Sequence, residues 1–444
     1  MTDLLAARTQ MAMSLGFHIV FAALGIAMPA LIAAAEWRWL ATGDRDSLDL
    51  AHRWSKGTAI LFAVGAVSGT VLSFELGLLW PAFMERAGPM IGPLFALEGF
   101  AFFTEAIFLG IYLYGWSRIP QRVHFMSGLV VTASGVASAW FVVTVNAWMN
   151  EPTGLGPSGT VAADLDPLAP LWTPAALNQV LHMVLAALAA TGFLVAGIHA
   201  WMLLRDPTSG LHRLALTIAF AVGGIPAFLQ PLSGDLIARS VAVHQPAKLA
   251  AIEALFRTEA GPDFVLGGIP NAESRTVSYA VLIPHGLSLL LHHNTQAEVT
   301  GLDRFPIENW PPVAVVHIAF QLMVGCGILM AAVACWCGWR MWRADRIEHN
   351  RRLLYALIAT APLGFIALEA GWVVTEVGRQ PWIIYNVMRT SEAITPMPGL
   401  WIPMATFSAL YAVLAGVVCW AMWRHVAAAS RSLPAPAGDK ESSW

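Results

Sequence analysis

Residues 178–204 read NQVLHMVLAALAATGFLVAGIHAWMLL, a run of 27 residues that contains no Asp, Glu, Lys or Arg. About 20 apolar residues in a helix cross the roughly 30 Å hydrocarbon core of a bilayer. The run therefore predicts a membrane-spanning helix. It also places a histidine, His182, close to one end of that helix, where a polar side chain is costly unless it has a partner or a function.

Eight further runs have the same character. Membrane barrel strands alternate over about ten residues, so runs of this length favour helices. The chain is 57% hydrophobic and 12% charged, with a mean hydropathy of +0.62, which excludes an ordinary soluble domain. We predict an all-α integral membrane protein with nine transmembrane helices. The runs are 15–36, 57–80, 93–116, 124–146, 178–204, 214–233, 311–339, 353–375 and 400–423.

The distribution of basic residues predicts the orientation. The short loops after the first, third, fifth and seventh runs, together with the C-terminal tail, hold sixteen Lys and Arg, whereas the opposite short segments hold four. By the positive-inside rule, the N-terminus is outside and the C-terminus cytoplasmic. The first run follows only a weakly basic segment and exceeds a usual signal-peptide core, so we expect an uncleaved helix.

The order of these runs divides the chain into four parts. Residues 1–234 hold six predicted helices, 235–308 form an external segment, 309–424 hold three more helices, and 425–444 form a cytoplasmic tail that is expected to be disordered from Arg431. The net charge is −3, and topology accounts for the basic residues, so no nucleic-acid partner is expected.

A small set of polar or metal-seeking side chains lies inside the apolar runs, mostly near their outer ends. Such residues are rare in hydrocarbon and usually serve a function. A His/Met pair suits a low-spin, electron-transferring haem, and further His or carboxylate ligands suit high-spin haem. The pattern points to redox cofactors in the outer half of the membrane. The residues are His18, Glu98, Glu105, His182, Met323 and Glu376.

Alternatives remain open at this level. Glu98 and Glu105 also fit the proton relay of a haem-free transporter, and Met323 by itself is more often a core residue. A cytochrome b electron-transfer module is a third class, although it usually pairs histidines on shared helices. His124, His199 and His317 are interpreted as structural. Spacing alone does not choose between these classes.

Several longer motifs resemble subunit I of the cytochrome bd quinol oxidases, in order from residue 8 to about 420. They are GFH at 16–18, EGFAFFTE at 98–105, NAWMNEP at 146–152, QPAKLAAIE at 245–253 and GWVVTEVGRQPW at 371–382.

The resemblance implies a role for each matching residue. His182 and Met323 are the expected axial ligands of a low-spin b haem, and His18 and Glu376 the ligands of two high-spin haems, a b haem and either haem d or a further b. Glu98 and Glu105 are expected on the proton path. Arg8, Trp372 and Arg379 are expected near propionates or between haems, and Asn146 near the oxygen-reducing site.

The external segment resembles the quinol-binding loop of that family, with Lys248 and Glu253 in contact with quinol. Without the resemblance, these two residues would be interpreted as a surface ion pair on an amphipathic helix. The short loop resembles the cyanide-insensitive branch, and Gln321 stands where many members have Arg, which bears on the potential of the low-spin haem.

The resemblance also implies the setting of the protein. We expect a bacterial cytoplasmic membrane, a second multi-helix subunit, often a small single-helix subunit, ubiquinol or menaquinol as electron donor, dioxygen as acceptor, and surrounding lipid. The implied reaction oxidises quinol at the outer face and reduces dioxygen to water with cytoplasmic protons. It generates a proton motive force without pumping.

Overall fold

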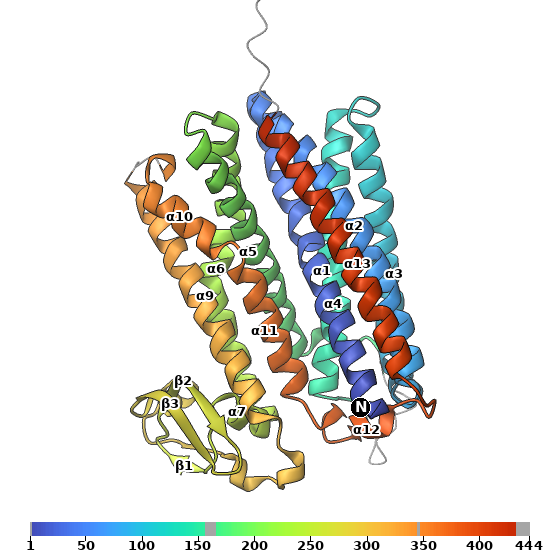
Figure 1. Cartoon of the computed structure of the whole chain (residues 1–444), viewed down its shortest axis with the longest axis vertical. Helices are drawn as coiled ribbons and strands as arrows, with labels where there is room; N and C mark the ends of the chain where they lie inside the picture. The colour runs from blue at the N-terminus through green and yellow to red at the C-terminus, as the bar shows by residue number, and fades with distance from the viewer. Residues whose placement is uncertain (1, 156–165, 344–346, 432–444) are drawn as a thin grey trace, which may run out of the picture.

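A bundle of long helices makes up most of the molecule (Figure 1). The computed structural model describes residues 2–155, 166–343 and 347–431. Within these ranges, nine helical spans are long and apolar enough to cross a membrane, as predicted. They are α1 (Asp3–Thr42), α2 (Arg45–Leu79), α3 (Pro81–Gly115), α4 (Gln121–Asn150), α5 (Pro174–Arg205), α6 (Gly210–His244), α9 (Val313–Trp342), α10 with α11 (Arg351–Thr360 and Leu363–Val377), and α13 (Trp401–Arg431).

Local chemistry explains where several helices begin. Asp44, Thr173 and Ser209 each accept a backbone N–H of the first helical turn through the side chain, which satisfies a donor that the helix itself leaves unpaired. The eighth span is interrupted between α10 and α11 at Pro362, which has no N–H to donate to the preceding turn. The single predicted run 353–375 is therefore two helices in one span.

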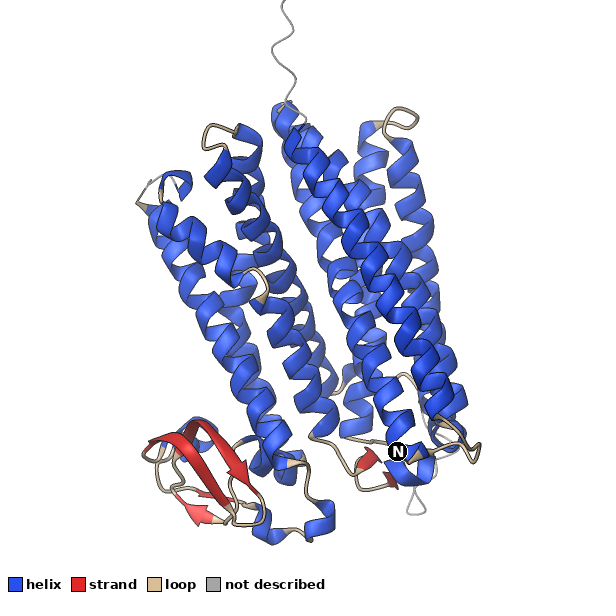
Figure 2. Ribbon diagram, viewed as in Figure 1, coloured by secondary structure: helices blue, strands red, loops and turns tan. Residues whose placement is uncertain are grey.

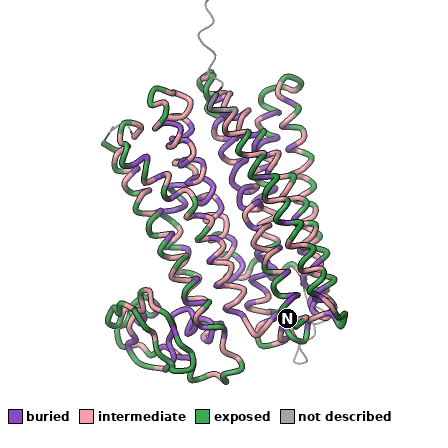
Figure 3. The backbone as a smooth tube through the Cα atoms, viewed as in Figure 1, coloured by how far each residue is buried: buried purple, intermediate pink, exposed green. Residues whose placement is uncertain are grey.

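The centre of the bundle lies around α1 and α5. Helix α5 packs against α1, α4, α6, α10 and α11, so it joins the two groups of helices seen side by side in Figure 1. Buried residues concentrate on the inward helix faces and exposed ones on the periphery (Figure 3). Large apolar side chains such as Phe74, Phe100 and Trp420 are exposed on the outside of the bundle, as expected for faces that contact lipid.

Within the described residues, strands occur only at one end of the bundle, the end that carries the N-terminus (Figure 2). The segment between α6 and α9 contains α7 (Pro246–Ile252), a hairpin of β2 (Phe264–Asn271) and β3 (Thr276–Ile283), α8 (Gly286–His292), and the short pair β1 (Glu259–Ala260) and β4 (Glu298–Val299). Short 3-10 turns lie at Leu302–Arg304 and Ile307–Asn309. The all-α prediction holds for the bundle, but the sequence analysis did not identify these strands.

Other connections between the spans contain short elements of their own. The turn η1 (Ala169–Trp172) precedes α5, and η4 (Ile347–His349) precedes α10. Between α11 and α13 the chain forms β5 (Trp382–Ile384), β6 (Met388–Arg389) and α12 (Thr390–Ala393). Helix α6 continues to His244, so the expected division at residue 235 falls inside a helix. The predicted disorder beyond Arg431 concerns residues outside the described ranges.

Candidate functional site

Three of the predicted polar residues lie close to the end of the bundle that carries the strands. Glu376 is one residue from the end of α11, Asn146 is four residues from the end of α4, and His182 is in the third turn of α5. These helix ends all approach the N-terminal end of the bundle (Figure 1). These three side chains therefore come from three helices and lie within about three turns of the same end of the bundle, as expected of a site built between helices.

The His182 imidazole is fixed by a neighbouring hydroxyl. Ser233 of α6 donates its O–H to the Gln230 carbonyl at 2.9 Å, and its Oγ lies 2.8 Å from His182 Nδ1. Because that hydroxyl proton is already used, Oγ accepts from Nδ1–H. The arrangement assigns the tautomer that leaves Nε2 with a free lone pair.

His18 of α1 has the same arrangement with another serine. Ser68 of α2 donates to the Val64 carbonyl at 2.9 Å, and its Oγ lies 3.0 Å from His18 Nδ1. A Cβ at Gly69 would lie 2.9 Å from His18 Cε1, so the glycine lets the ring approach α2 closely. His18 therefore also presents Nε2 as its available nitrogen.

Met323 of α9 lies against α11. A Cβ at Gly371 would lie 3.0 Å from the Met323 sulfur, so the absence of a side chain there makes room for the thioether. Trp372, the next residue, packs at a cluster that includes Ile19 of α1 and Ala187 of α5. The expected ligands thus come from α1, α5, α9 and α11.

Arg379 forms the centre of a buried polar network. It is 2% exposed, and it donates from Nη2 to Glu376 Oε2 at 2.6 Å and from Nη1 to Asn146 Oδ1 at 3.1 Å. Asn146 in turn donates to Gln179 Oε1 at 3.2 Å. The guanidinium therefore fixes both the carboxylate and the amide, two groups predicted from the sequence to act together.

The network continues through Asn150 to the segment between α6 and α9. Asn150 Nδ2 donates to Asn146 Oδ1 at 3.2 Å, and Asn150 Oδ1 accepts from Lys248 Nζ at 2.6 Å. Gln245 also donates to the Asn150 carbonyl, at 2.8 Å. A continuous chain of hydrogen bonds thus joins Lys248, Asn150, Asn146, Arg379 and Glu376.

Lys248 and Glu253 are not a surface ion pair. They are 4% and 3% exposed, and no ion pair joins them among the described residues. Burial, reinforced by Arg379 and opposed by Glu376 and Glu151, lowers the pKa of Lys248 to about 7. Burial raises the pKa of Glu253 to about 8, and its Oε2 is buried without a hydrogen-bond partner. Both groups therefore titrate near neutral pH, where acid–base residues are most effective.

The two glutamates of α3 lie at different depths. Glu98 Oε1 accepts from Ser138 of α4 at 3.1 Å, whereas Glu105 is 6% exposed and lies beside α1 and α4. The two carboxyl groups are within electrostatic reach of one another. Arg8, near the start of α1, is exposed, whereas the other expected site residues are buried or partly buried.

Sequence reasoning missed several residues of the site. Ser68 and Ser233 were not singled out because a serine in an apolar helix is common, and only the fold reveals which histidine it faces. Asn150 lies four residues after Asn146, one helical turn along the same face, so its spacing could have indicated a shared role. His317 was interpreted as structural, and it bonds the backbone of the external segment at two carbonyls, those of Ile252 and Gly267.

The donor set fits haem. A histidine that ligates a metal almost always donates its other ring N–H to a neighbouring acceptor, and both His18 and His182 do so. The Met323 thioether packs against Gly371, and the Glu376 carboxylate is bound by Arg379. Together with the two histidines, they form a set of His, Met and carboxylate side chains, which are residue types that can bind haem iron. No group of three or more His, Cys, Asp or Glu suited to a metal ion occurs among the described residues.

The fold and these side chains define a class: a multi-helix membrane protein whose bundle contains buried or partly buried residues of the types that can ligate haem. The family model of cytochrome bd terminal oxidase subunit I matches residues 6–430. This chain belongs to the cytochrome bd terminal oxidase subunit I family.

Individual proteins are similar along nearly the whole chain. A Bacillus subtilis (strain 168) protein provisionally named cytochrome bd menaquinol oxidase subunit I is 33% identical over 428 residues, which cover 95% of this chain and 96% of that one. Cytochrome bd ubiquinol oxidase subunit 1 of the same organism is 28% identical, with 96% and 94% covered. The bd oxidase structure from Geobacillus thermodenitrificans has a TM-score of 0.89 at 37% identity and covers 96% of this chain and 98% of its own.

Proposed function

We propose that this chain is the quinol-oxidising, haem-binding subunit of an electrogenic bd-type oxidase, working with a second subunit. Family membership supports the quinol oxidase activity, the haem cofactors and the partner subunit. The observation that carries the finer proposal is the hydrogen-bond chain from Lys248 to Glu376, because it links the proposed quinol site to the proposed haem ligands.

Four residues are proposed to hold haem iron. His182 and Met323 would ligate a low-spin b haem, and His18 and Glu376 would ligate the two high-spin haems, a b haem and either haem d or a second b. When bound, these haems supply one-electron carriers and an iron site for dioxygen reduction. Arg8, Arg379 and Trp372 would interact with propionates or lie between the haems, and Asn146 would lie beside the oxygen-reducing site.

The external segment is proposed to bind quinol, ubiquinol or menaquinol, at α7. Glu253 in its ionised form accepts a phenolic proton, and Lys248 orients the ring oxygen by donating a hydrogen bond. Burial of both groups excludes water, and the pKa values near 7 and 8 allow each to change protonation state at neutral pH. The quinol protons are released at this face of the membrane.

Protons for water formation are proposed to come from the opposite face. Glu105 and Glu98 lie in sequence along α3 towards the site, and Ser138 holds Glu98 in position. An electron that reaches a buried centre favours protonation of a nearby carboxyl, so uptake from one side builds a membrane potential without a pump. This direction follows from the positive-inside orientation, with the N-terminus outside, in a bacterial cytoplasmic membrane.

The test uses the complex purified with its second subunit. We expect reduced haem spectra and oxygen uptake driven by quinol in the wild type. Asn150→Leu keeps the size of the side chain but breaks the chain of hydrogen bonds. A hydrogen bond to a charged group contributes about 1.5–3 kcal/mol, so kcat/KM for quinol should fall roughly 10- to 100-fold while the spectrum remains.

The matched control is Asn309→Leu. Asn309 accepts a hydrogen bond from Arg389 at the same end of the bundle but outside the network, so its loss should leave kcat/KM for quinol near the wild-type value. A colourless wild-type complex would favour a haem-free transporter, and spectra without oxygen uptake would favour an electron-transfer module. Equal kcat/KM values for the two variants would refute the role given to the network.

A further inference from the structure

A second buried polar cluster lies at the opposite end of the bundle from the proposed haem site. Glu36 of α1 is fully buried, and its Oε1 lies 2.7 Å from Nδ1 of His124 in α4. His124 Nε2 lies 2.9 Å from the Tyr112 carbonyl of α3. Glu36 is six residues from the end of α1, so the cluster is close to the end that lacks the strands.

The hydrogen bonds of this cluster determine where a proton can reside. A carbonyl oxygen only accepts, so His124 Nε2 carries the proton that bonds Tyr112 O. The Nδ1 to Oε1 hydrogen bond then holds one further proton, which either the imidazole or the carboxyl can carry. Removal of that proton leaves an unpaired buried carboxylate, which is strongly unfavourable. The pair therefore regains a proton after each loss.

Unsatisfied atoms surround the pair. Glu36 Oε2 and the Tyr112 hydroxyl are both buried and neither forms a well-aligned hydrogen bond, although the two side chains lie close enough to interact with each other. Buried polar atoms without partners are few in folded proteins and call for an explanation such as an ordered water or a catalytic role. His52 of α2 is a further titratable group near the pair, and the Trp116 ring contacts both histidines, with ring centroids 3.9 Å from His52 and 4.1 Å from His124.

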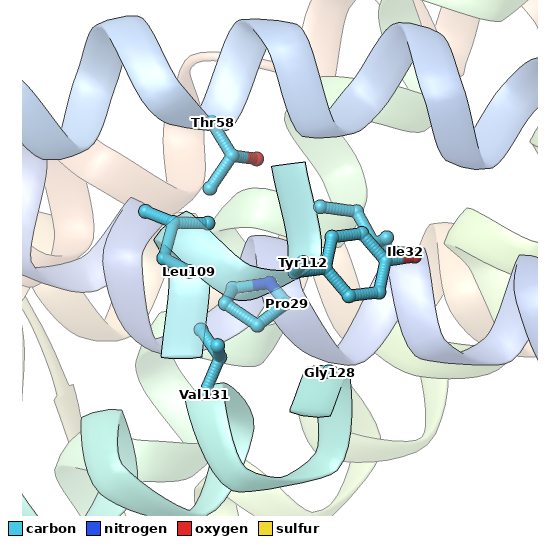
Figure 4. A pocket seen from close by; sticks show the side chains of 7 residues that line it. All are labelled: Pro29, Ile32, Thr58, Leu109, Tyr112, Gly128 and Val131. Atoms are coloured by element: carbon cyan, nitrogen blue, oxygen red, sulfur yellow. The ribbon is translucent and has the colours of Figure 1, made fainter. Parts of the chain in front are cut away.

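A small pocket adjoins Tyr112 (Figure 4), and the order of residues along three helices places it between the cluster and Glu105. Its walls are Pro29, Ile32, Thr58, Leu109, Tyr112, Gly128 and Val131.

Three helices agree on the order along the bundle. In α1, the cavity residues 29 and 32 lie between Gly25, beside Glu105, and Glu36. In α4, Val131 and Gly128 lie between Gly135 and His124. A Cβ at Gly135 would be 3.7 Å from Glu105 Cδ, so Gly135 marks the Glu105 end of the interval. In α3, Leu109 lies between Glu105 and Tyr112. The separation of 11 residues in α1 corresponds to roughly 16 Å.

A backbone carbonyl, that of Gly25, provides a further polar atom at the Glu105 end of this interval. Pro29 has no N–H, so the Gly25 carbonyl lacks its usual helical donor. A Cβ at Gly135 would lie 3.5 Å from that oxygen, which places it near the Glu105 carboxyl. The pocket is mostly apolar and has room for about one water molecule. Proton transfer to Glu105 would therefore require transient hydration of this interval, with the Thr58 and Tyr112 hydroxyls as the polar groups at the wall.

We propose that the Glu36–His124 pair, with Tyr112, is the entrance through which this chain takes up protons for delivery to Glu105. The proposal rests on the proposed function, because it needs a proton-consuming reaction at the haem site. A purely structural role for the pair, as a bond between α1 and α4, predicts loss of stability on mutation but no specific effect on proton uptake.

The test compares Glu36→Gln with wild-type complex. After the fully reduced enzyme is mixed with dioxygen, a pH-indicating dye reports proton uptake. We expect at least a tenfold slower uptake and an equally lower kcat for oxygen, with unchanged haem spectrum and unchanged rate of haem reduction by quinol. Glu36→Asp, which restores a carboxyl, should recover most of the rate.

The control is Glu75→Gln. Glu75 is another buried glutamate with one unpaired oxygen and one bond to a side chain, from Gln10 Nε2 at 2.8 Å, but it lies near the other end of α2. It should keep the wild-type rate. Should Glu36→Gln fail to fold, Tyr112→Phe removes only a hydroxyl and should slow uptake at least threefold.

Wild-type proton uptake in Glu36→Gln, or in Tyr112→Phe if that variant is used, would overturn the proposed entrance while leaving the haem and quinol sites intact. Absence of quinol-driven oxygen uptake in the wild type would instead contradict the proposed function itself.

Discussion

Glu253 is the residue whose chemistry depends most on its surroundings. Its place in the motif QPAKLAAIE was visible in the sequence, but only the fold shows that Glu253, directly after α7, is buried, with Oε2 lacking a partner. Burial raises the pKa of its carboxyl to about 8. A carboxyl at a quinol site can accept a proton only when it is ionised, so its pKa should control the rate.

This leads to a prediction about pH. Below pH 8 the Glu253 carboxyl is protonated and cannot accept the quinol proton; above pH 8 it is ionised and can. We expect kcat/KM for quinol to rise with pH and to level off above an apparent pKa of about 8. The measurement is quinol-driven oxygen uptake of the complex from pH 6 to 9.

Two variants separate this effect from a general pH response. Glu253→Gln should lower the rate and flatten the profile, whereas Glu273→Gln, in the exposed turn of the β2–β3 hairpin, should keep the wild-type profile. A Glu253→Gln enzyme with the same rising limb would show that another group titrates.

Among the elements, the β2–β3 hairpin is held in place by one helix. Gln321 of α9 accepts from the Gly267 N–H at 3.0 Å and donates to the Val265 carbonyl at 2.8 Å, and His317 lies 2.9 Å from the Gly267 carbonyl. His317 also lies 2.7 Å from the Ile252 carbonyl, one residue before Glu253. Helix α9 thus connects the hairpin, the end of α7 and the Met323 region.

We therefore expect Gln321→Ala to loosen the hairpin. Two lost hydrogen bonds amount to about 2 kcal/mol, or a roughly 30-fold faster local opening. Hydrogen exchange of peptides covering β2 should report this increase. Thr276→Ala, in β3 on the far side of the hairpin from α9, serves as the control and should change exchange little. Unchanged exchange in Gln321→Ala would show that the hairpin is held by other contacts.

Gln321 lies two residues before Met323, so the sequence posed the question of how Gln321 affects the redox potential of the low-spin haem. In the structure, the oxygen and the nitrogen of the Gln321 amide both form hydrogen bonds with the backbone of β2. A neutral amide that is hydrogen-bonded to the hairpin adds no positive charge near Met323, whereas Arg would. The residue types did not reveal this bonding, because its partner is a strand that the sequence did not predict.

At the scale of the whole molecule, the sequence predicted the nine spans because hydrophobicity over about 20 residues is a local property. It located His18, His182 and Glu376 because polar residues are conspicuous in apolar runs. It could not provide the tautomers of the histidines, which depend on Ser68 and Ser233 of other helices. It also could not provide the path from Lys248 to Glu376, because Asn150 and Asn146, which connect Lys248 to Arg379, belong to a helix distant in the sequence from both ends of the path. The break at Pro362 within a predicted run likewise became clear only with the fold.

The central claim is that buried side chains of this bundle ligate haem, and the reduced-minus-oxidised spectrum of the purified complex tests it most directly. We expect His182→Ala to lose the low-spin haem signal. His199→Ala, which removes another buried histidine whose Nδ1 lies 3.1 Å from His212 Nδ1, should retain it. A His182→Ala complex with the wild-type spectrum would contradict the account.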